Sequence, residues 1–244
     1  MMTKREKAFR EAAHKYIKRM EGDPDVIGII LSGSLVHAEI DPNSDVDIYV
    51  ITDPYCLERE RGNTWIDGVE IEYFMNPPQQ IRAYFVKEKS PHTAHILANG
   101  EVVFSRSDEV QKLIEEAKAV LAEAPPAPSA VQIELFKYHF DDLCKDYADC
   151  LLREDAFATT WLKSEIARHA MLVFCQVHRI HHDKVKRLEG QLRLIDPAFA
   201  DMLKDFVLSD WQAEGPLKVL RQKMSLLLGG ERKREWVLRS DLDL

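Results

Sequence analysis

The sequence predicts an α+β protein in which a small mixed sheet flanked by helices is followed by an all-α helical bundle. Three observations predict this order. Short apolar runs with strand periodicity end before residue 124, a proline-rich stretch occupies residues 124–130, and only helical periodicity is found after it. We therefore divide the chain into a first domain over residues 1–123, a linker over residues 124–130 and a helical bundle domain over residues 131–244.

Composition and charge are those of an ordinary globular protein. Of the 244 residues, 45% are hydrophobic and 30% are charged. Apolar runs are too short for a membrane span, and the N-terminus lacks the apolar region of a secretory signal, so we expect a cytoplasmic protein. The net charge of -8 argues against general binding to nucleic acid. It does not exclude a nucleotide that is brought in with magnesium.

Hydrophobic periodicity places the elements of the first domain. Residues 4–20 have the spacing of an amphipathic helix, and Val26–Leu31 suits a buried strand. A polar loop follows, and Val46–Thr52 alternates as a second strand. Trp65–Met75 alternates as a third strand with a turn signal inside it. The later elements expected are a helix that begins at Pro77 and Pro78 and runs to about Lys87, a short strand from Glu101 to Phe104, and a helix to about Ala122 capped by Asp108 or, alternatively, Ser107.

The helical domain is expected to contain two long helices and two shorter ones. The long pair lies between Val131 and His182, with a break near Asp155. Pro197 and Pro216 mark the starts of the two further helices, because proline is tolerated in the first turn of a helix.

The segment from Leu31 to Ile51 carries the residues suited to chemistry. Gly33 and Ser34 follow the first strand, and ten residues separate Ser34 from Asp45. Asp45 and Asp47 stand at positions i and i+2 of the second strand, so both point to one face of the sheet, about 6 to 7 Å apart along the chain. The third strand then brings Glu72, with Glu70 two residues before it.

Paired carboxylates on the face of a sheet need compensation, because burying an ionised carboxylate costs several kcal/mol. Magnesium offers it, since this ion prefers hard oxygen ligands and two such ions can clamp a phosphoryl transfer. The turn at Gly33 and Ser34 would supply N–H groups and a hydroxyl to phosphate oxygens.

This pattern resembles the signature of the polymerase β-like nucleotidyltransferase superfamily: a Gly-Ser turn, a spacer, Asp-hydrophobic-Asp, and a third acid on a later strand. Ser44, directly before Asp45, also matches many members. Within the superfamily, an α/β half followed by a helical bundle is similar to the antibiotic-modifying branch, which includes kanamycin and lincosamide nucleotidyltransferases. The motif covers residues 27–74, and the helical half resembles that branch in layout only.

The resemblance implies roles for individual residues. Gly33 and Ser34 would bind the β- and γ-phosphates, and Ser44 is assigned to the same nucleotide-binding group. The metal ligands and catalytic residues would be Asp45, Asp47 and Glu72.

Two departures from the family pattern stand out. The third acid is Glu72 where Asp is commoner, and Glu70 on the same face is its competitor. The turn also reads His37 and Ala38 where many relatives have Arg and Gly. Both departures leave room for a chain with reduced activity.

The function expected from the resemblance is transfer of a nucleotide from Mg²⁺-NTP, with ATP as the expected NTP, to a hydroxyl of a small-molecule acceptor. An aminoglycoside-like acceptor is one candidate. The alternatives are a nucleotide-binding regulatory or antitoxin-like module and a nucleotidyltransferase that modifies proteins. The base for the acceptor hydroxyl would be Glu72 or a carboxylate of the first bundle helix, which carries Glu134, Asp141, Asp142 and Asp146. The sequence specifies neither the acceptor, nor the NTP base, nor the oligomeric state.

Overall fold

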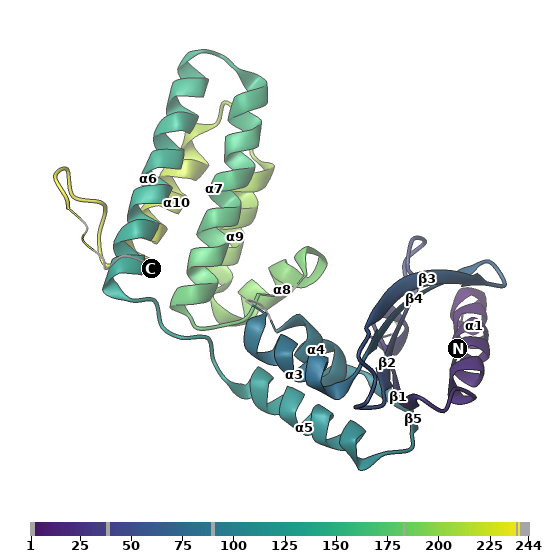
Figure 1. Ribbon diagram of the computed structural model, residues 1–244. Helices are drawn as coiled ribbons and strands as arrows, with labels where there is room; N and C mark the ends of the chain where they lie inside the picture. The colour runs from purple at the N-terminus through teal and green to yellow at the C-terminus, as the bar shows by residue number, and fades with distance from the viewer. Residues whose placement is uncertain (1–2, 38–39, 89–90, 183, 238, 240–244) are drawn as a thin grey trace. The chain divides into compact units, whose positions relative to one another are not determined.

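The computed structural model describes residues 3–37, 40–88, 91–182, 184–237 and 239. The chain forms two compact units, Met1–Glu123 and Ala124–Leu244. The first unit contains a five-stranded sheet and the second is helical within its described residues (Figure 1). The predicted fold class is therefore confirmed.

The sheet of the first unit has the strand order β3-β4-β2-β1-β5. Strands β2 and β4 pair in parallel, whereas the other neighbours are antiparallel. The strands are β1 (Val26–Ser32), β2 (Val46–Thr52), β3 (Glu60–Ile66), β4 (Val69–Asn76) and β5 (Glu101–Ser105). The helices of this unit are α1 (Lys4–Glu21), α2 (Ser34–His37), α3 (Pro78–Lys87), α4 (His92–Asn99) and α5 (Asp108–Ala122).

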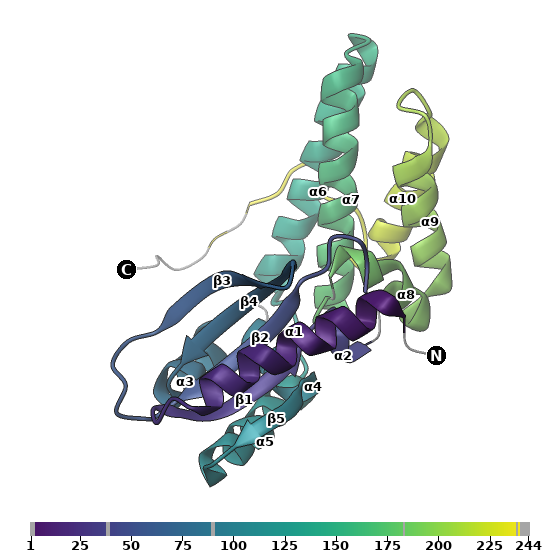
Figure 2. The same ribbon diagram turned by 90° about the vertical axis from the view of Figure 1, so that its right-hand side faces the viewer.

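Helices cover both faces of this sheet, and alternation along the strands explains why. Helix α1 lies along one face, as Figures 1 and 2 show, where Ile29, Ile48 and Ile71 belong to one apolar core. On the opposite face Ile30 and Tyr49 join the core formed with α3, α4 and α5. Because successive strand residues point to opposite faces, the central strands feed two cores at once.

The region predicted as one interrupted third strand is two strands. Asp67 and Gly68 have φ of 51° and 78°, the left-handed backbone that a two-residue hairpin loop requires. The chain therefore reverses there, and β3 pairs with β4 in the antiparallel direction. The prediction of a single strand was wrong because the turn signal was interpreted as a local interruption.

Three smaller expectations also differ from the structure. Ser34–His37 forms a short helix where a polar loop was expected, and α4 was not anticipated. Helix α5 is capped by Ser107, whose side chain accepts a hydrogen bond from the Glu109 N–H, so the alternative cap holds and Asp108 is the first helical residue.

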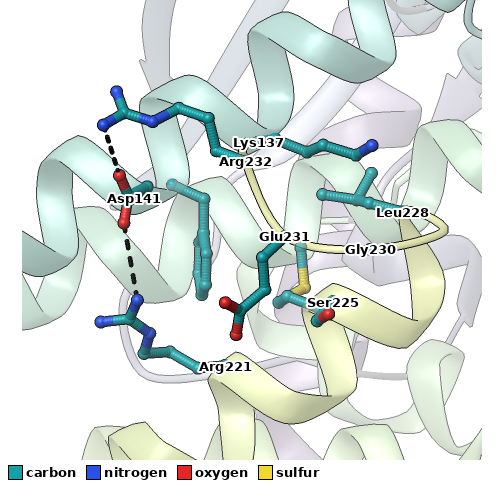
Figure 3. A pocket seen from close by; sticks show the side chains of 10 residues that line it. Lys137, Asp141, Arg221, Ser225, Leu228, Gly230, Glu231 and Arg232 are labelled. Atoms are coloured by element: carbon teal, nitrogen blue, oxygen red, sulfur yellow. Dashed lines mark hydrogen bonds and ion pairs between the residues drawn. The ribbon is translucent and has the colours of Figure 1, made fainter. Parts of the chain in front are cut away.

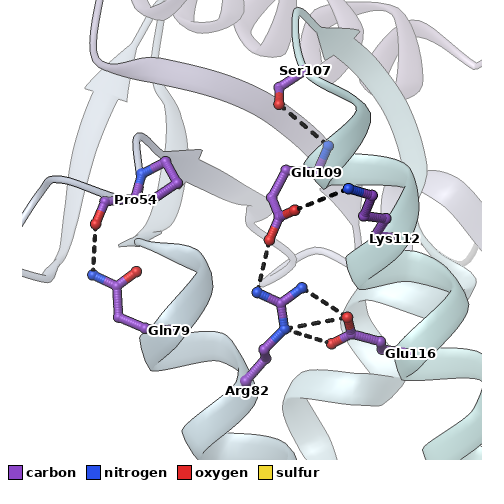
Figure 4. Close-up of polar contacts among 7 residues, drawn as sticks. All are labelled: Pro54, Gln79, Arg82, Ser107, Glu109, Lys112 and Glu116. Carbon is purple, nitrogen blue, oxygen red and sulfur yellow. Dashed lines mark hydrogen bonds and ion pairs between the residues drawn. The ribbon is translucent and has the colours of Figure 1, made fainter.

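Arg82 joins α3 to α5 through ion pairs (Figure 4). Its guanidinium donates to Glu109 Oε1 at 2.7 Å and to both carboxylate oxygens of Glu116. The Glu116 hydrogen bonds are the main cause of a raised Arg82 pKa. Charged groups arranged as a bidentate pair hold their helices in register better than isolated surface pairs do.

The second unit consists of two long helices and three shorter ones within its described residues. They are α6 (Ala130–Leu152), α7 (Ala156–Val177), α8 (Val185–Ile195), α9 (Pro197–Leu208) and α10 (Glu214–Leu227). Asp155, at the predicted break, caps α7 by accepting from the Ala158 N–H at 3.0 Å. Phe174 and Phe199 stack with ring centroids 4.0 Å apart and so join α7 to α9 in the core. Helix α8 was not anticipated.

Charged residues surround a pocket of the second unit between α6, α10 and the segment that follows α10 (Figure 3). Asp141 accepts ion pairs from Arg221 at 3.5 Å and Arg232 at 3.0 Å. The Arg232 guanidinium also lies 5.4 Å from the Tyr138 ring centroid. These contacts fasten the segment after α10 to helix α6.

None of the helices in the described ranges combines the length and the apolar character that a bilayer crossing requires.

Gly28 provides the close approach between β1 and α5, and we predict that Gly28→Ala destabilises the protein. A Cβ at this position would lie 2.4 Å from Val110 Cγ2. Overpacking of this kind costs about 1 to 3 kcal/mol, which chemical denaturation would measure. Val110→Ala removes the clashing methyl groups, so the double variant should be more stable than the sum of the two single effects. Strict additivity would contradict this explanation.

Candidate metal and nucleotide site

Pairing between strands brings the predicted acids together at one end of the sheet. Asp47 on β2 lies opposite Glu72 on β4 in the parallel ladder, and opposite Ser32 on β1 in the antiparallel one. Asp45 precedes the first residue of β2 by one position. Residues opposite each other in a ladder point to the same face, so the side chains of Asp47 and Glu72 are neighbours.

Asp45, Asp47 and Glu72 form one cluster of carboxylates. Each contributes an oxygen, and these oxygens all lie within 4.8 Å of one another. All three residues are partly buried, so their charges are only partly screened by water. The cluster lies at the end of the sheet face whose inner part carries Tyr49.

Glu72, not Glu70, joins this cluster. The Glu70 carboxylate accepts a hydrogen bond from Asn63 Nδ2 at 2.5 Å and is not part of the group of three. Both residues share a face of β4, as expected, but only Glu72 lies beside Asp47 in the ladder. The geometry thus favours Glu72 as the third acid.

Gly33 lies in direct contact with the cluster. Its φ is 73°, and a Cβ built on it would lie 1.8 Å from Asp47 Oδ2 and 2.8 Å from Asp47 Cγ. Glycine is thus required at this position for two reasons: the backbone is left-handed, and the Asp47 carboxylate occupies the space that a side chain would need.

Ser34 and Ser44 occupy different environments. Ser34 Oγ is buried without a hydrogen-bond partner among the described residues. A buried hydroxyl usually has a partner, and a ligand oxygen is one way to supply it. Ser44 Oγ accepts from the Asp41 N–H at 2.8 Å, while the Ser44 N–H donates to the Asp41 carbonyl. Ser44 therefore closes the turn that leads into Asp45.

The donor set fits a divalent cation of the magnesium type. Two oxygens on opposite sides of one such ion are about 4 to 5 Å apart, which matches the 4.8 Å limit within the cluster. All three donors are carboxylates, the hard ligands that magnesium and calcium prefer. The Ser34 hydroxyl, which has no partner among the described residues, adds a polar group for an oxyanion.

An aromatic layer supports the carboxylates from inside the sheet. Tyr49 and Phe74, next along the same face of β2 and β4, stack with ring centroids 5.9 Å apart. Tyr49 accepts a hydrogen bond from Asn76 Nδ2 at 3.0 Å, and burial raises the pKa of its hydroxyl. This packed layer lies next to Asp47 and Glu72 on the same face of β2 and β4.

The other residues singled out in the sequence either belong to the helical unit or fall outside the described residues. Ala38 lies outside the described residues, and the His37 side chain is likewise not described. In the helical unit Asp141 is held by ion pairs, and Glu134 pairs with Lys137 at 2.8 Å. These acids therefore have structural partners of their own.

Sequence reasoning missed Arg61. Its Nη2 donates to Glu72 Oε1 at 2.7 Å, although it stands eleven positions before Glu72 in the chain. The signal that could have found it is the Asp-Gly turn, because a two-residue loop at 67–68 fixes which β3 residues lie opposite β4.

Comparisons with known proteins give a family match over the part of the chain that carries the cluster. Residues 14–109 match the family model described as polymerase beta, nucleotidyltransferase, and this segment contains all five strands and the whole carboxylate cluster. No curated protein matches the chain. A crystal structure of a nucleotidyltransferase-like protein from Exiguobacterium sibiricum 255-15 matches with 15% identity, 90% of this chain, 74% of that chain and a TM-score of 0.49. The family match supports the nucleotidyltransferase superfamily, and neither match names an antibiotic-modifying branch.

We predict that Gly33→Ala weakens metal binding by about 10- to 100-fold, the range found when the support of a metal ligand is removed. The added methyl group would displace the Asp47 carboxylate, and a titration with Mn²⁺ would measure the loss.

Gly68→Ala is the matched control for this substitution. Gly68 has a similar φ of 78° but no atom within 4 Å of a built Cβ, so it carries the backbone strain without the collision. Its variant should lose stability and keep its affinity for Mn²⁺. Equal affinities for the Gly33 variant and the wild type would show that Asp47 does not depend on this glycine.

Proposed function

We propose that this protein is a metal-dependent nucleotidyltransferase that transfers a nucleoside monophosphate from an NTP to a hydroxyl acceptor. The observation that carries the proposal is the cluster of Asp45, Asp47 and Glu72 within 4.8 Å, with Gly33 against Asp47. The family match over residues 14–109 supports the same activity. The nucleotide is expected to be ATP with Mg²⁺ and the acceptor a small molecule.

Asp45, Asp47 and Glu72 would hold the divalent ions. When bound, such ions orient the triphosphate and offset the charge that develops at the α-phosphate. Ser34 Oγ, which has no partner among the described residues, would donate to an oxygen of the terminal phosphates. Ser44 contributes by holding the turn before Asp45, so a direct nucleotide contact from it is not required.

The reaction forms a bond between the acceptor oxygen and the α-phosphorus and breaks the bond from that phosphorus to the β-phosphate oxygen. Pyrophosphate leaves with the electron pair, and the acceptor proton passes to a carboxylate. Glu72 is the candidate base within the cluster, and general-base catalysis of this kind contributes about 10²- to 10⁴-fold.

The decisive test is Asp47→Asn with pyrophosphate release and transfer of label from α-labelled ATP as readouts. We expect a loss of about 100-fold or more, the scale seen when one electrostatic group is removed from an active site. The substitution preserves size, so the fold should persist, which a thermal unfolding curve would check. Full activity in this variant would remove the aspartate pair from the chemistry.

The same labelled ATP distinguishes the acceptor classes. A labelled small molecule from a panel of hydroxyl compounds, aminoglycosides included, would support the proposal as stated. Labelled protein bands in a lysate would instead identify a protein-modifying enzyme. Magnesium-dependent ATP binding without pyrophosphate release would favour a regulatory module.

The two glutamates of β4 provide a second, internally controlled prediction. Glu72→Gln should reduce both Mn²⁺ affinity and transfer about 10- to 100-fold, as loss of a metal ligand or its support does. Glu70→Gln makes the same chemical change two residues away, where the carboxylate bonds Asn63, and it should leave both readouts close to wild type. The opposite ranking would assign the third acidic position to Glu70.

A further inference from the structure

Arg61 forms an ion pair with one member of the carboxylate cluster. The distance from Arg61 Nη2 to Glu72 Oε1 is 2.7 Å. The Arg61 side chain is 68% exposed, whereas that of Glu72 is 28% exposed. A guanidinium in this position offsets part of the repulsion among the three acids.

A second contact fixes the guanidinium at this place. Arg61 lies opposite Phe74 in the β3–β4 ladder, and its guanidinium carbon is 4.7 Å from the centroid of the Phe74 ring. The stem of Arg61 therefore lies along the same face as Glu72, and the cation rests on an aromatic surface that favours it. Two contacts, with the Glu72 carboxylate and with the Phe74 ring, therefore act on the Arg61 guanidinium.

Glu72 consequently lies between the Arg61 guanidinium and the position that a bound divalent ion would take. On one side are Asp45 and Asp47, with which it would share a divalent ion, and on the other is Arg61. An ion bound by all three acids would lie close to the guanidinium, and these like charges repel. One carboxylate has acceptor sites for both partners, but the guanidinium and the ion compete for its negative charge.

We propose that Arg61 is a positioning residue that holds Glu72 in the metal-free protein and competes with the divalent ion for that carboxylate. The inference rests on the proposed function, because it takes the acidic cluster as a metal site. It adds that the guanidinium lowers the affinity of Glu72 for the ion, so metal affinity is set by β3 as well as by the acids.

Sheet order separates this role from phosphate binding. The order β3-β4-β2-β1 places Arg61 at one side of the cluster, and the turn that follows β1 at the other. In the proposed reaction the terminal phosphates lie at that turn, so Arg61 is on the side away from them. Its effect on the metal therefore does not pass through the terminal phosphates.

The experiment measures Mn²⁺ affinity by electron paramagnetic resonance, with Mn²⁺ alone and with a saturating non-hydrolysable ATP analogue. Arg61→Met removes the charge and keeps the apolar stem. It should bind Mn²⁺ about three- to tenfold more tightly than wild type, because a nearby positive charge has been removed from a partly solvated site. Arg61→Lys keeps the charge and should return the affinity towards wild type.

Arg59→Met is the matched control. Arg59 lies two residues away and bonds the Tyr84 hydroxyl, not the acidic cluster, so it tests the loss of one positive charge by itself and should leave the affinity unchanged. The Glu72→Gln background supplies a further control. If Arg61 acts mainly through Glu72, then Arg61→Met should raise Mn²⁺ affinity less there than in the wild-type background.

The outcomes separate the two proposals. Unchanged or weaker Mn²⁺ binding by Arg61→Met, or an equal gain in Arg59→Met, would overturn the role of Arg61. A gain of equal size in the Glu72→Gln background would overturn action through Glu72. Wild-type affinity in Asp47→Asn, or no Mn²⁺ binding by the wild type in either state, would instead overturn the metal site and with it the proposed function.

Discussion

Mutual repulsion among three carboxylates is the constraint on which the active end of the sheet depends. Asp45, Asp47 and Glu72 bring their oxygens within 4.8 Å of one another, and their partial burial limits the screening that water provides. The surrounding structure offsets this cost locally. Arg61 places a positive charge beside one acid, and the parallel ladder of β2 and β4 holds Asp47 and Glu72 in fixed positions. A divalent ion would complete the compensation.

The parts of the fold that follow from local rules could be predicted from the sequence. The strand Val46–Thr52 matches its alternation, and the helix Pro78–Lys87 follows the proline that begins it. The grouping of Asp45 with Asp47 follows from strand periodicity, and Glu72 follows from the family pattern. Periodicity does not specify which strands become neighbours, so the parallel pairing of β2 with β4, on which the cluster depends, emerged only from the structure.

The elements that were missed have physical reasons. Helix α4 is only eight residues long. No side-chain hydrogen bond caps the N-terminus of α8. Neither helix therefore carries a strong start signal in the sequence. The hairpin at Asp67 and Gly68 was present in the sequence as an Asp-Gly pair, the commonest hairpin signal. Because this pair was interpreted as an interruption within one strand, β3 was not predicted as a separate strand. The position of Arg61 beside Glu72 was therefore missed as well.

The position of β3 at the outer edge of the sheet has a consequence for association between molecules. An edge strand offers its outward N–H and C=O groups to any other strand that can approach, and exposed apolar residues encourage that approach. Trp65 on β3 is 64% exposed, so the strand is attractive to a second chain along part of its length. The charges of Glu60 and Arg61 at its start resist such pairing. The same arginine that faces Glu72 therefore also helps to keep the molecule from polymerising through its sheet.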